Sequence, residues 1–591
     1  MTGQPCSWVL RGFEFMWTSG IRSPMTYAPL PCFARHLVMV LAGFAVGCIA
    51  PDQAASGRSA TVASSPGAAH IEAETMKRTG GNSLSGAGMV GAILYENKDS
   101  LKTHFAFSAA GRWHIDVRGS SSDKHPAGVT VFIDGQARAS GWFLSRTPQI
   151  LALVVDVDTA GTHEVRLSQT TDVGENDAYI DWIEVRWAGA ATKAPTPPAT
   201  GAVASGQWRN LFVERGYAEA EVVRKIEETW RSLFHGDPDN EAVYFEKGSS
   251  PDGPLAYVMD IGNGDVRSEG MSYGMMVAVQ LDHKHEFDAL WNWAHTFMAH
   301  PDPKDPVHGY FAWQMRPDGK IMDPMPAPDG EEYFVSALYF ADARWGSGKG
   351  IYDYHAEADQ LLRAMRSRAD LGTVTSVFNR EQKQVRFTPN MKDFSSNGDH
   401  TDPSYHLPAF YEVWARVGPE SEAAFWREAA KISRDFLERA ANPTTGLVPD
   451  YAEFDGRPKP RKTDPGGGDF RYDAWRAAMN WSVDDAWWAA DPRARDRSDR
   501  LQAFFERQGL WTYVNRYHLD GRPIENQRSL GLAAANAVAS LAATDVRAWR
   551  FVDELWSARV PHGLWRYYDG MLYMMGLLHT SGQFRPYFPP R

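Results

Sequence analysis

The stretch RSEGMSYGMMVAVQL, residues 267–281, decides the fold of the larger part of the chain. Its second half, MMVAVQL, is apolar on all sides of a helix, which is typical of a helix buried inside a large protein. Glu269 stands at the start of this helix among small residues. An acid is costly to bury there unless it lies at the wall of a cavity. The stretch therefore predicts an inner helix that presents one carboxylate to a cavity.

Residues 207–591 carry helical periodicity throughout. About eleven segments place apolar residues at positions i, i+3 and i+4. Most are amphipathic, as in residues 218–234 (AEAEVVRKIEETWRSLF), whereas residues 533–542 (AAANAVASLA) are apolar nearly all round. Amphipathic outer helices paired with apolar inner helices predict an all-α toroid rather than a simple bundle.

Residues 69–187 have a different pattern, in which apolar and polar residues alternate between short Gly and Asp turns. This alternation is typical of an all-β sandwich. Residues 188–206 (AGAATKAPTPPATGAVASG) are rich in Pro, Ala and Thr and contain almost no bulky side chain. We expect them to form an extended linker that does not pack.

The N-terminal segment has the pattern of an export signal. In residues 35–48 (RHLVMVLAGFAVGC) a basic pair precedes a short apolar run and small residues. Cys48 lies where a lipoprotein carries its lipid, after an extension over residues 1–34 and before a small, polar tether over residues 49–68. The three cysteines all lie before residue 50, which excludes disulfides and thiol chemistry from the body. No later stretch is apolar enough to predict a membrane helix.

The composition limits the partners. The net charge of −12 argues against a nucleic-acid partner, which would require a basic face. The 22 tryptophans suit either a large core or sugar rings, which offer C–H faces for stacking. Metal-dependent and serine hydrolase motifs and nucleotide-binding loops are missing from the sequence.

Carboxylates flanked by aromatic residues remain as candidates for chemistry. Besides Glu269, they are Asp329 in APDGEEYF (327–334) and Asp473 in FRYDAWRAAMNW (470–481), where Arg476 follows three positions later. Each has a structural interpretation: a favourable charge at a helix N-terminus, a helix N-cap and an intrahelical ion pair. Together they fit glycosidic hydrolysis, which needs one protonated and one ionised carboxyl group.

At these residues the chain closely resembles glycoside hydrolase family 8. The motifs SEGMSYGMMVAVQ (268–280), FAWQM (311–315), APDGEEYFVSALYFADARWG (327–346), DPSYHLPAFYEVWA (402–415), NPTTGLVPDYAEFDG (442–456), YDAWRAAMN (472–480) and RYYDGMLYMMGLL (566–578) follow in order. The resemblance implies an (α/α)6 toroid that hydrolyses β-1,4-linked polysaccharides with inversion. It implies no catalytic cofactor, and we expect a monomer.

The resemblance also implies roles for single residues. Glu269 matches the general acid, Asp473 the general base and Asp329 the residue that holds the distorted sugar. Asp464 and Asp469 lie close to Asp473 in the sequence and leave the assignment of the base open. The substrate-binding residues expected from the same motifs are Tyr405, which would position the attacking water, Arg476, Tyr273, Trp313 and Tyr472.

Within the family, the motifs are most similar to the branch that releases xylose from the reducing end of xylo-oligosaccharides. That branch blocks its cleft with a Leu-His-Pro element, where this chain has Arg528 and Ser529 in NQRSLGLAAANA (526–537). Endo-acting xylanase, glucanase or chitosanase activity therefore stays an alternative. A non-catalytic polysaccharide-binding lipoprotein is an alternative of a different class.

The β-sandwich resembles, more weakly, carbohydrate-binding modules of the family 6 and 35 type, which are jelly rolls. The resemblance rests on IEAE (71–74) and YIDWIEV (179–185). It implies a structural Ca²⁺ held by Glu72, Glu74 and Asp181, because hard oxygen ligands suit this ion. Trp142, Phe143 and Tyr95 are candidates for a sugar platform.

Overall fold

The structure is a computed structural model that describes residues 68–589 except 87, 123–125, 172–175, 368–373 and 391–396. The predicted export signal, the lipidation site Cys48 and nearly all of the tether lie outside the described residues. The described residues all belong to one compact unit. Among the described residues, no helix has both the length and the hydropathy that a membrane span requires.

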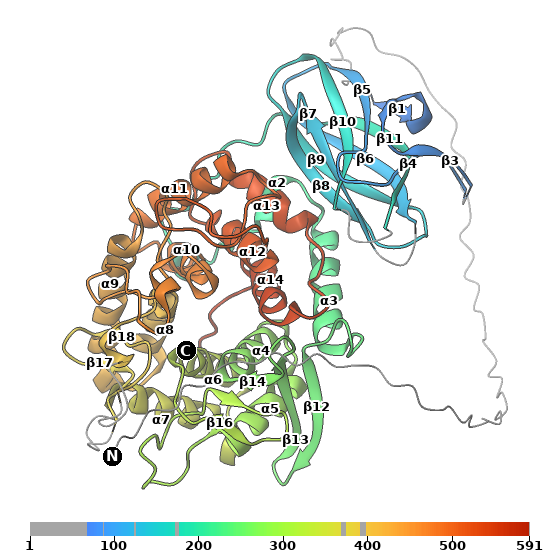
Figure 1. Cartoon of the computed structure of the whole chain (residues 1–591). Coiled ribbons are helices and arrows are strands. Elements are labelled where there is room, and N and C mark those ends of the chain that lie inside the picture. The colour runs from blue at the N-terminus through green and yellow to red at the C-terminus, as the bar shows by residue number, and fades with distance from the viewer. Residues whose placement is uncertain are drawn as a thin grey trace, which may run out of the picture. The chain divides into compact units, whose positions relative to one another are not determined.

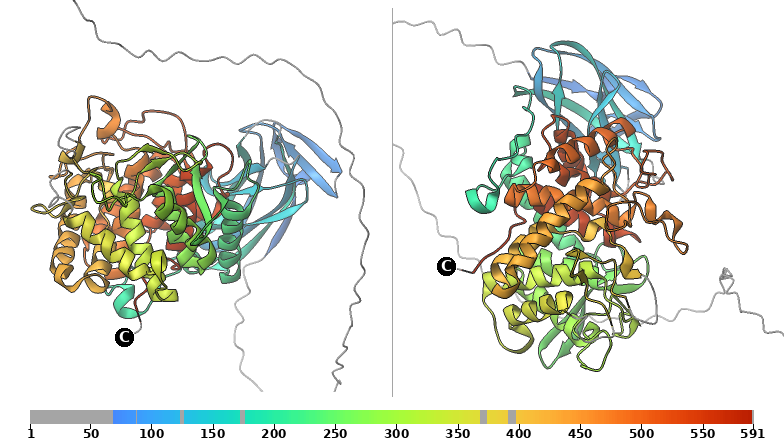
Figure 2. Two further views of the ribbon diagram at one scale, coloured as in Figure 1. Left: turned by 90° about the horizontal axis from the view of Figure 1, so that it is seen from below. Right: turned by 90° about the vertical axis from the view of Figure 1, so that its left-hand side faces the viewer.

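The N-terminal part is the predicted β-sandwich, drawn in blue and cyan in Figures 1 and 2. One sheet has the order β3 (Asn82–Gly86), β4 (Met89–Leu94), β11 (Ala178–Gly189), β6 (Gly111–Ser121) and β9 (Gln149–Val157), with β1 (Ala69–Glu72) also paired to β11. The other has the order β2 (Lys77–Thr79), β5 (Ser100–Phe107), β10 (Gly161–Thr171), β7 (Ala127–Ile133) and β8 (Gln136–Phe143). All the pairings are antiparallel. The inward residues of both sheets, among them the fully buried Trp113, form a separate core.

Six inner helices form a closed ring, as the sequence predicted. They are α4 (Ser268–Leu281), α6 (Pro328–Trp345), α8 (Pro408–Val417), α10 (Arg476–Trp488), α12 (Leu530–Ala539) and α14 (Arg566–Thr580). Each contacts the next, and α14 contacts α4, so the last helix closes the ring on the first (Figure 1). Nearly every residue of α4 and α12 is buried, which explains why their sequences lack a polar face.

Six outer helices alternate with the inner ones along the chain. They are α3 (Glu219–His235), α5 (Lys284–Trp293), α7 (Tyr354–Ser367), α9 (Ala423–Ala440), α11 (Arg493–Gln508) and α13 (Ala548–Ser557). Each buries one face; α3, for example, buries Val222, Ile226, Trp230 and Leu233 and exposes charged residues between them. The six inner and six outer helices make the (α/α)6 toroid that the family resemblance implied.

A five-stranded antiparallel sheet in the helical part was not predicted. Its order is β12 (Tyr244–Ser250), β13 (Gly253–Asp260), β14 (Asp265–Arg267), β15 (Gln314–Met315) and β16 (Ile321–Asp323). Most of these strands are too short to show a period of two. Strand β14 is followed directly by α4, so the sheet fixes the position of the first turn of α4, which contains Glu269. Further short elements are β17 (Phe378–Asn379), β18 (Gln384–Val385), α1 (Ala202–Ser205) and α2 (Leu211–Arg215).

The linker packs against the toroid, which corrects the expectation that residues 188–206 could not pack. Pro195 and Pro197 are buried. The carbonyl of Lys193 accepts a hydrogen bond from the indole of Trp549 at 2.8 Å, and another linker carbonyl accepts one from Arg495 at 3.0 Å. A Pro-rich segment without bulky side chains can therefore pack along a helical surface through its proline rings and its backbone carbonyls.

Arg215 joins the sandwich, the linker and the toroid. Its guanidinium donates to Asp553 on α13 at 2.8 and 2.9 Å, to Asp156 on β9 at 2.6 Å and to the hydroxyl of Thr192 at 2.8 Å. The side chains of Arg215 and Asp553 are 2% and 1% exposed. A buried acid of this kind is tolerated only while its cation is present.

We expect Arg215→Met to lower the free energy of unfolding by about 3–5 kcal/mol, because Asp553 would stay buried without a cation. Urea denaturation followed by tryptophan fluorescence measures this change. Arg224→Met is the control, since Arg224 and Glu228 form an exposed pair, and it should change stability by less than about 1 kcal/mol. Equal effects of the two variants would contradict the clamping role of Arg215.

Candidate active site

Glu269 lies in the first turn of α4 and meets a tyrosine from α14. The hydroxyl of Tyr567 donates to Glu269 Oε1 at 2.7 Å. Gly270 makes this contact possible, because a Cβ atom at position 270 would lie 2.6 Å from the ring of Tyr567. The glycine beside the acid is thus explained by the close approach of an aromatic ring.

The guanidinium of Arg476 connects three carboxylates that come from different parts of the chain. Its Nη1 donates to Glu269 Oε2 at 3.1 Å and to Asp329 Oδ2 at 2.8 Å. Its Nη2 lies 2.9 Å from Asp473 Oδ1 and donates to Ser404 Oγ at 3.0 Å. The three acids predicted from the sequence therefore form one cluster around a single cation.

Burial sets the protonation of this cluster. The side chains of Arg476 and Asp329 are each 5% exposed and that of Glu269 is 13% exposed, whereas Asp473 is 30% exposed. Desolvation raises the pKa of Glu269 to about 7, although Arg476 opposes the shift. Desolvation also raises the pKa of Asp329. At neutral pH, Glu269 is thus poised between its protonated and ionised forms.

Asp473 is held in a different way from Glu269. It lies in a short 3-10 helix, Tyr472–Trp475, immediately before α10, and accepts a hydrogen bond from the hydroxyl of Tyr568 at 3.2 Å. Two consecutive tyrosines of α14 therefore donate hydrogen bonds to the two acids, Tyr567 to Glu269 and Tyr568 to Asp473. Sequence reasoning missed both, although RYYDG was among the motifs that carried the family resemblance.

The neighbouring acids Asp464 and Asp469 are engaged elsewhere. Asp464 forms an ion pair with Arg471, and Asp469 lies 2.8 Å from His518 Nδ1. Asp473 is therefore the acid of this loop that contacts Arg476. Of the three candidates for the base in the TDPGGGDF region, the geometry therefore favours Asp473.

A cavity of about 720 Å³ opens beside Asp473. Trp313 and Tyr405, both predicted to bind substrate, line it together with Asp473. Further lining residues that the sequence did not single out are Phe387, Tyr451, Arg461 and the segment 323–327. Aromatic walls next to a carboxylate cluster suit a sugar chain.

The other predicted substrate-binding residues lie in different environments. Tyr472 is 44% exposed beside Asp473, with a φ of 37°, and can face a ligand. Tyr273 is fully buried and its hydroxyl is hydrogen-bonded to Arg476. Its predicted contact with substrate is therefore corrected to a role in positioning Arg476. Asp329 follows Pro328 inside α6 and is not the N-cap, which is Ala327.

Two further buried acids adjoin Asp473. Carboxylate oxygens of Asp402, Asp450 and Asp473 lie within 4.8 Å of one another, the one group of this kind within the described ranges. One oxygen of Asp402 and one of Asp450 have no hydrogen-bond partner. Desolvation, reinforced by Asp473, raises the pKa of both acids well above the ordinary value. Arg471 Nε donates to Asp450 Oδ2 at 2.8 Å and partly offsets this shift for Asp450.

The predicted calcium ligands do not fit that ion. Asp181 forms an ion pair with Arg118 and accepts a hydrogen bond from the backbone N–H of Val90 at 2.9 Å. Glu72 pairs with His70 at 3.1 Å, and Glu72, Glu74 and Asp181 form no three-acid group among the described residues. Two of the three acids that the resemblance assigned to Ca²⁺, Glu72 and Asp181, are thus paired with other side chains. Phe143, a candidate for the sugar platform, is fully buried in the sandwich core.

Comparisons with known proteins identify the helical part. Residues 252–582 match the family described as Glycosyl hydrolases family 8. The reducing-end xylose-releasing exo-oligoxylanase Rex8A of Paenibacillus barcinonensis is 43% identical over 392 residues, which cover 66% of this chain and 98% of that protein. The structure of a family 8 xylanase mutant with xylohexaose from Teredinibacter turnerae is 52% identical, with a TM-score of 0.64, and covers 66% of this chain and 100% of its own. Endoglucanase 2 of Ruminiclostridium josui is 27% identical and is covered to 65%.

We expect Glu269→Gln to stabilise the protein at pH 8 and not at pH 4.5. The folded state raises the pKa of Glu269 from 4.5 to about 7, so it binds this proton more tightly than the unfolded state does. Its stability therefore falls as the pH rises through that range, by up to about 3 kcal/mol. A neutral glutamine does not carry this cost.

Urea denaturation of both proteins at the two pH values measures the effect. Glu246→Gln, at an exposed position of β12, is the control and should behave alike at both values. A stability difference for Glu269→Gln that does not change with pH would contradict the buried, proton-binding state of Glu269.

Proposed function

The chain belongs to glycosyl hydrolase family 8, and from this premise we propose that it hydrolyses β-1,4-xylosidic bonds in xylo-oligosaccharides with inversion, releasing xylose from the reducing end. The observation that carries the proposal is the cluster in which Arg476 contacts Glu269, Asp329 and Asp473 at 2.8–3.1 Å. The cluster contains one acid with a pKa raised to about 7, which is partly protonated near neutral pH, and one more exposed acid, Asp473. These are the two groups that the reaction requires.

Glu269 is proposed to act as the general acid. Its carboxyl proton passes to the glycosidic oxygen as the bond between that oxygen and C1 breaks. Burial favours the protonated form, whereas Arg476 and Tyr567 stabilise the carboxylate that remains after transfer. The two influences together keep the acid usable near neutral pH.

Asp473 is proposed to act as the general base. It takes one proton from a water molecule while the water oxygen forms a bond to C1 on the face opposite the leaving group. The product then carries the inverted configuration. Arg476 and Tyr568 hold the carboxylate in place, and its exposure of 30% lets water reach it. Tyr405, which lines the same cavity, is proposed to orient that water.

A second candidate function is internal cleavage of xylan. Arg528 and Ser529 stand where the exo-acting branch carries its blocking element, and both are turned to the scaffold. Arg528 forms an ion pair with Glu554 at 2.6 Å, and Ser529 caps α12 by accepting from the N–H of Leu532 at 3.2 Å. The 52% identity to a family member described as a xylanase supports this candidate as well. Glucanase and chitosanase activity are less favoured, because the endoglucanase relative is more distant.

We further propose that the protein is exported and acts at a polysaccharide surface. The apolar run in residues 35–48 supports export, and Cys48 is the proposed site of lipidation. The β-sandwich is proposed to be a carbohydrate-binding module. In support, two thirds of this chain suffices to cover 98% of the exo-oligoxylanase relative, so the sandwich is an addition to the catalytic unit.

Xylohexaose labelled at its reducing end distinguishes the two candidates. Labelled xylose as the first labelled product is expected from trimming, whereas labelled xylobiose and xylotriose formed from the start would show internal cleavage. Cellohexaose and chitosan in parallel assays test the other β-1,4-linked substrates. Glu269→Gln should lower the rate about 100- to 10,000-fold, because protonation of the leaving group is lost. Unchanged sugar release by this variant would overturn the assignment of the acid.

The pH dependence of kcat/KM should also report the pKa of Glu269. We expect kcat/KM to fall above about pH 7, because the acid loses its proton there. Tyr567→Phe removes a hydrogen bond that favours the carboxylate form of Glu269. The fall in kcat/KM should therefore shift to higher pH in this variant. Tyr573→Phe on the same helix, where the hydroxyl bonds to the Ala558 carbonyl, is the matched control and should not move it. A shift of equal size in both variants would contradict the coupling of Tyr567 to the acid.

A further inference from the structure

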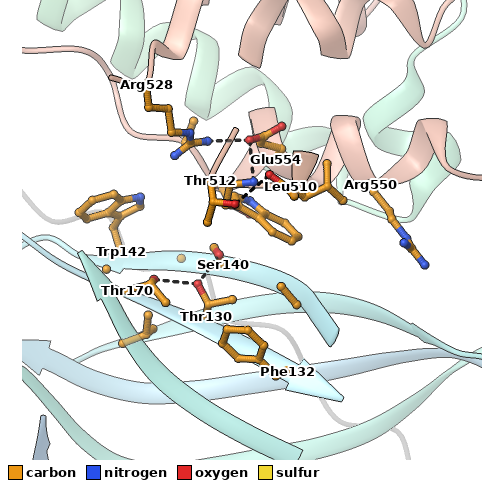
Figure 3. A pocket seen from close by; sticks show the side chains of 18 of the residues that line it. Thr130, Phe132, Ser140, Trp142, Thr170, Leu510, Thr512, Arg528, Arg550 and Glu554 are labelled. Carbon is orange, nitrogen blue, oxygen red and sulfur yellow. Dashed lines mark hydrogen bonds and ion pairs between the residues drawn. The ribbon is translucent and has the colours of Figure 1, made fainter. Parts of the chain in front are cut away.

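A second cavity, of about 350 Å³, lies where the β-sandwich meets the toroid. Figure 3 shows Thr130, Ser140 and Trp142 on the strand side, with Arg528 and Glu554 on the opposite side. We call it the interdomain cavity; strands β7 and β8 line it on one side, and residues 509–512 and α13 with its C-terminal flank line it on the other. It shares no lining residue with the cavity beside Asp473. Its ligand is therefore a separate question from the catalytic cluster.

The charges of the interdomain cavity do not balance. Arg528 is paired with Glu554 at 2.6 Å, and Arg550 is paired with Glu506 at 2.7 Å. Within the described part of the chain, no carboxylate pairs with the third guanidinium, that of Arg559. Burial lowers the pKa of Arg559 to about 10. A partly buried cation without an anion is costly, and in a protein of net charge −12 it is unexpected.

Aromatic rings lie beside this cation. The guanidinium carbon of Arg559 is 5.1 Å from the centre of a Trp142 ring. Trp511 also lines the cavity, and its Nε1–H is buried without an acceptor. Its backbone has a φ of 61°, an uncommon value for a large residue, and its N–H is held by Glu554 at 3.2 Å. The indole is thus fixed in place with an unused donor.

Hydroxyl groups complete the lining on the module side. Thr130 Oγ1 lies 2.7 Å from Ser140 Oγ and 2.8 Å from Thr170 Oγ1, and all three residues line the cavity. Indole faces, hydroxyl groups and a free N–H donor together suit a flat, hydroxyl-rich ring. The unpaired guanidinium adds a requirement for a negative charge on that ring.

We propose that the interdomain cavity binds a sugar ring that carries a carboxylate, of the hexuronic acid class, with the carboxylate on Arg559 and the ring against the indoles of Trp142 and Trp511. The sugar is either free or a branch of a polysaccharide. A neutral sugar fills the same space but leaves Arg559 without an anion. The site does not depend on the proposed hydrolytic function, since it uses none of the catalytic residues.

Isothermal titration of the full chain with D-glucuronate tests the site, in the Glu269→Gln background so that no substrate is consumed. D-glucose supplies the same ring without the charge, and inorganic phosphate supplies the charge without the ring. We expect glucuronate to bind at least ~10-fold more tightly than glucose, because a charge-assisted pair is formed only with the former. Equal affinities for glucose and glucuronate, or an equally tight binding of phosphate, would overturn the proposal.

Two arginine variants localise the binding. Arg559→Gln should weaken glucuronate binding at least ~10-fold. Arg550→Gln, in the same lining but already paired with Glu506, is the matched control and should retain affinity. Thermal unfolding midpoints of both variants verify that they are folded. Retained binding in Arg559→Gln would refute the assignment of the anion to this residue.

A glucuronosyl-branched xylo-oligosaccharide then distinguishes the two sources of the acid sugar. Displacement of bound glucuronate by the branched oligosaccharide, and not by its unbranched counterpart, indicates a site that reads branches on a polymer. Displacement by neither assigns the site to the free acid. Displacement by both would contradict the proposal, because the unbranched chain carries no carboxylate.

Discussion

The active site depends on one buried cation. Arg476 is 5% exposed and lies within 3.1 Å of carboxylate oxygens of Glu269, Asp329 and Asp473. Three acids brought so close would repel one another and pay a large desolvation cost without it. A single guanidinium with five fixed donors can satisfy all three, whereas a lysine ammonium lacks that geometry. The acids differ in exposure: Glu269 is largely buried and its pKa is raised to about 7, whereas Asp473 is 30% exposed and reaches solvent.

The toroid is needed because the parts of this cluster are far apart in the sequence. Tyr567 and Glu269 are separated by 298 residues, and they meet because α14 closes the ring on α4. Tyr568, the next residue, reaches Asp473 from the same helix. Closure of the ring and assembly of the site are therefore one event, in which the last inner helix completes the environments of both acids.

Local patterns in the sequence revealed the helices, the sandwich and the three acids. Inner helices such as α4 and α12 stood out because burial on all sides leaves no polar face, and Glu269 stood out because it interrupts such a pattern. Tyr567, Tyr568, Asp402 and Asp450 were not recognised, because their importance comes from partners on other elements. The linker and the predicted calcium ligands failed for a related reason. Composition could not reveal that Lys193 and Pro198 bond to the toroid or that Arg118 neutralises Asp181.

The contact between the sandwich and the toroid bears on how the protein meets a polymer. A freely tethered module would only raise the local concentration of its partner. Here Arg215 fixes β9 to α13, and α13 also carries Glu554, which holds Arg528, the N–H of Trp511 and the hydroxyl of Tyr513. The family resemblance places Arg528 where the exo-acting branch has its blocking element. The module therefore docks on the helix that anchors the segment in which this chain departs from that branch. A change at the module surface that moves α13 would also move this segment through Glu554, so one buried carboxylate connects the sandwich to the segment that carries Arg528.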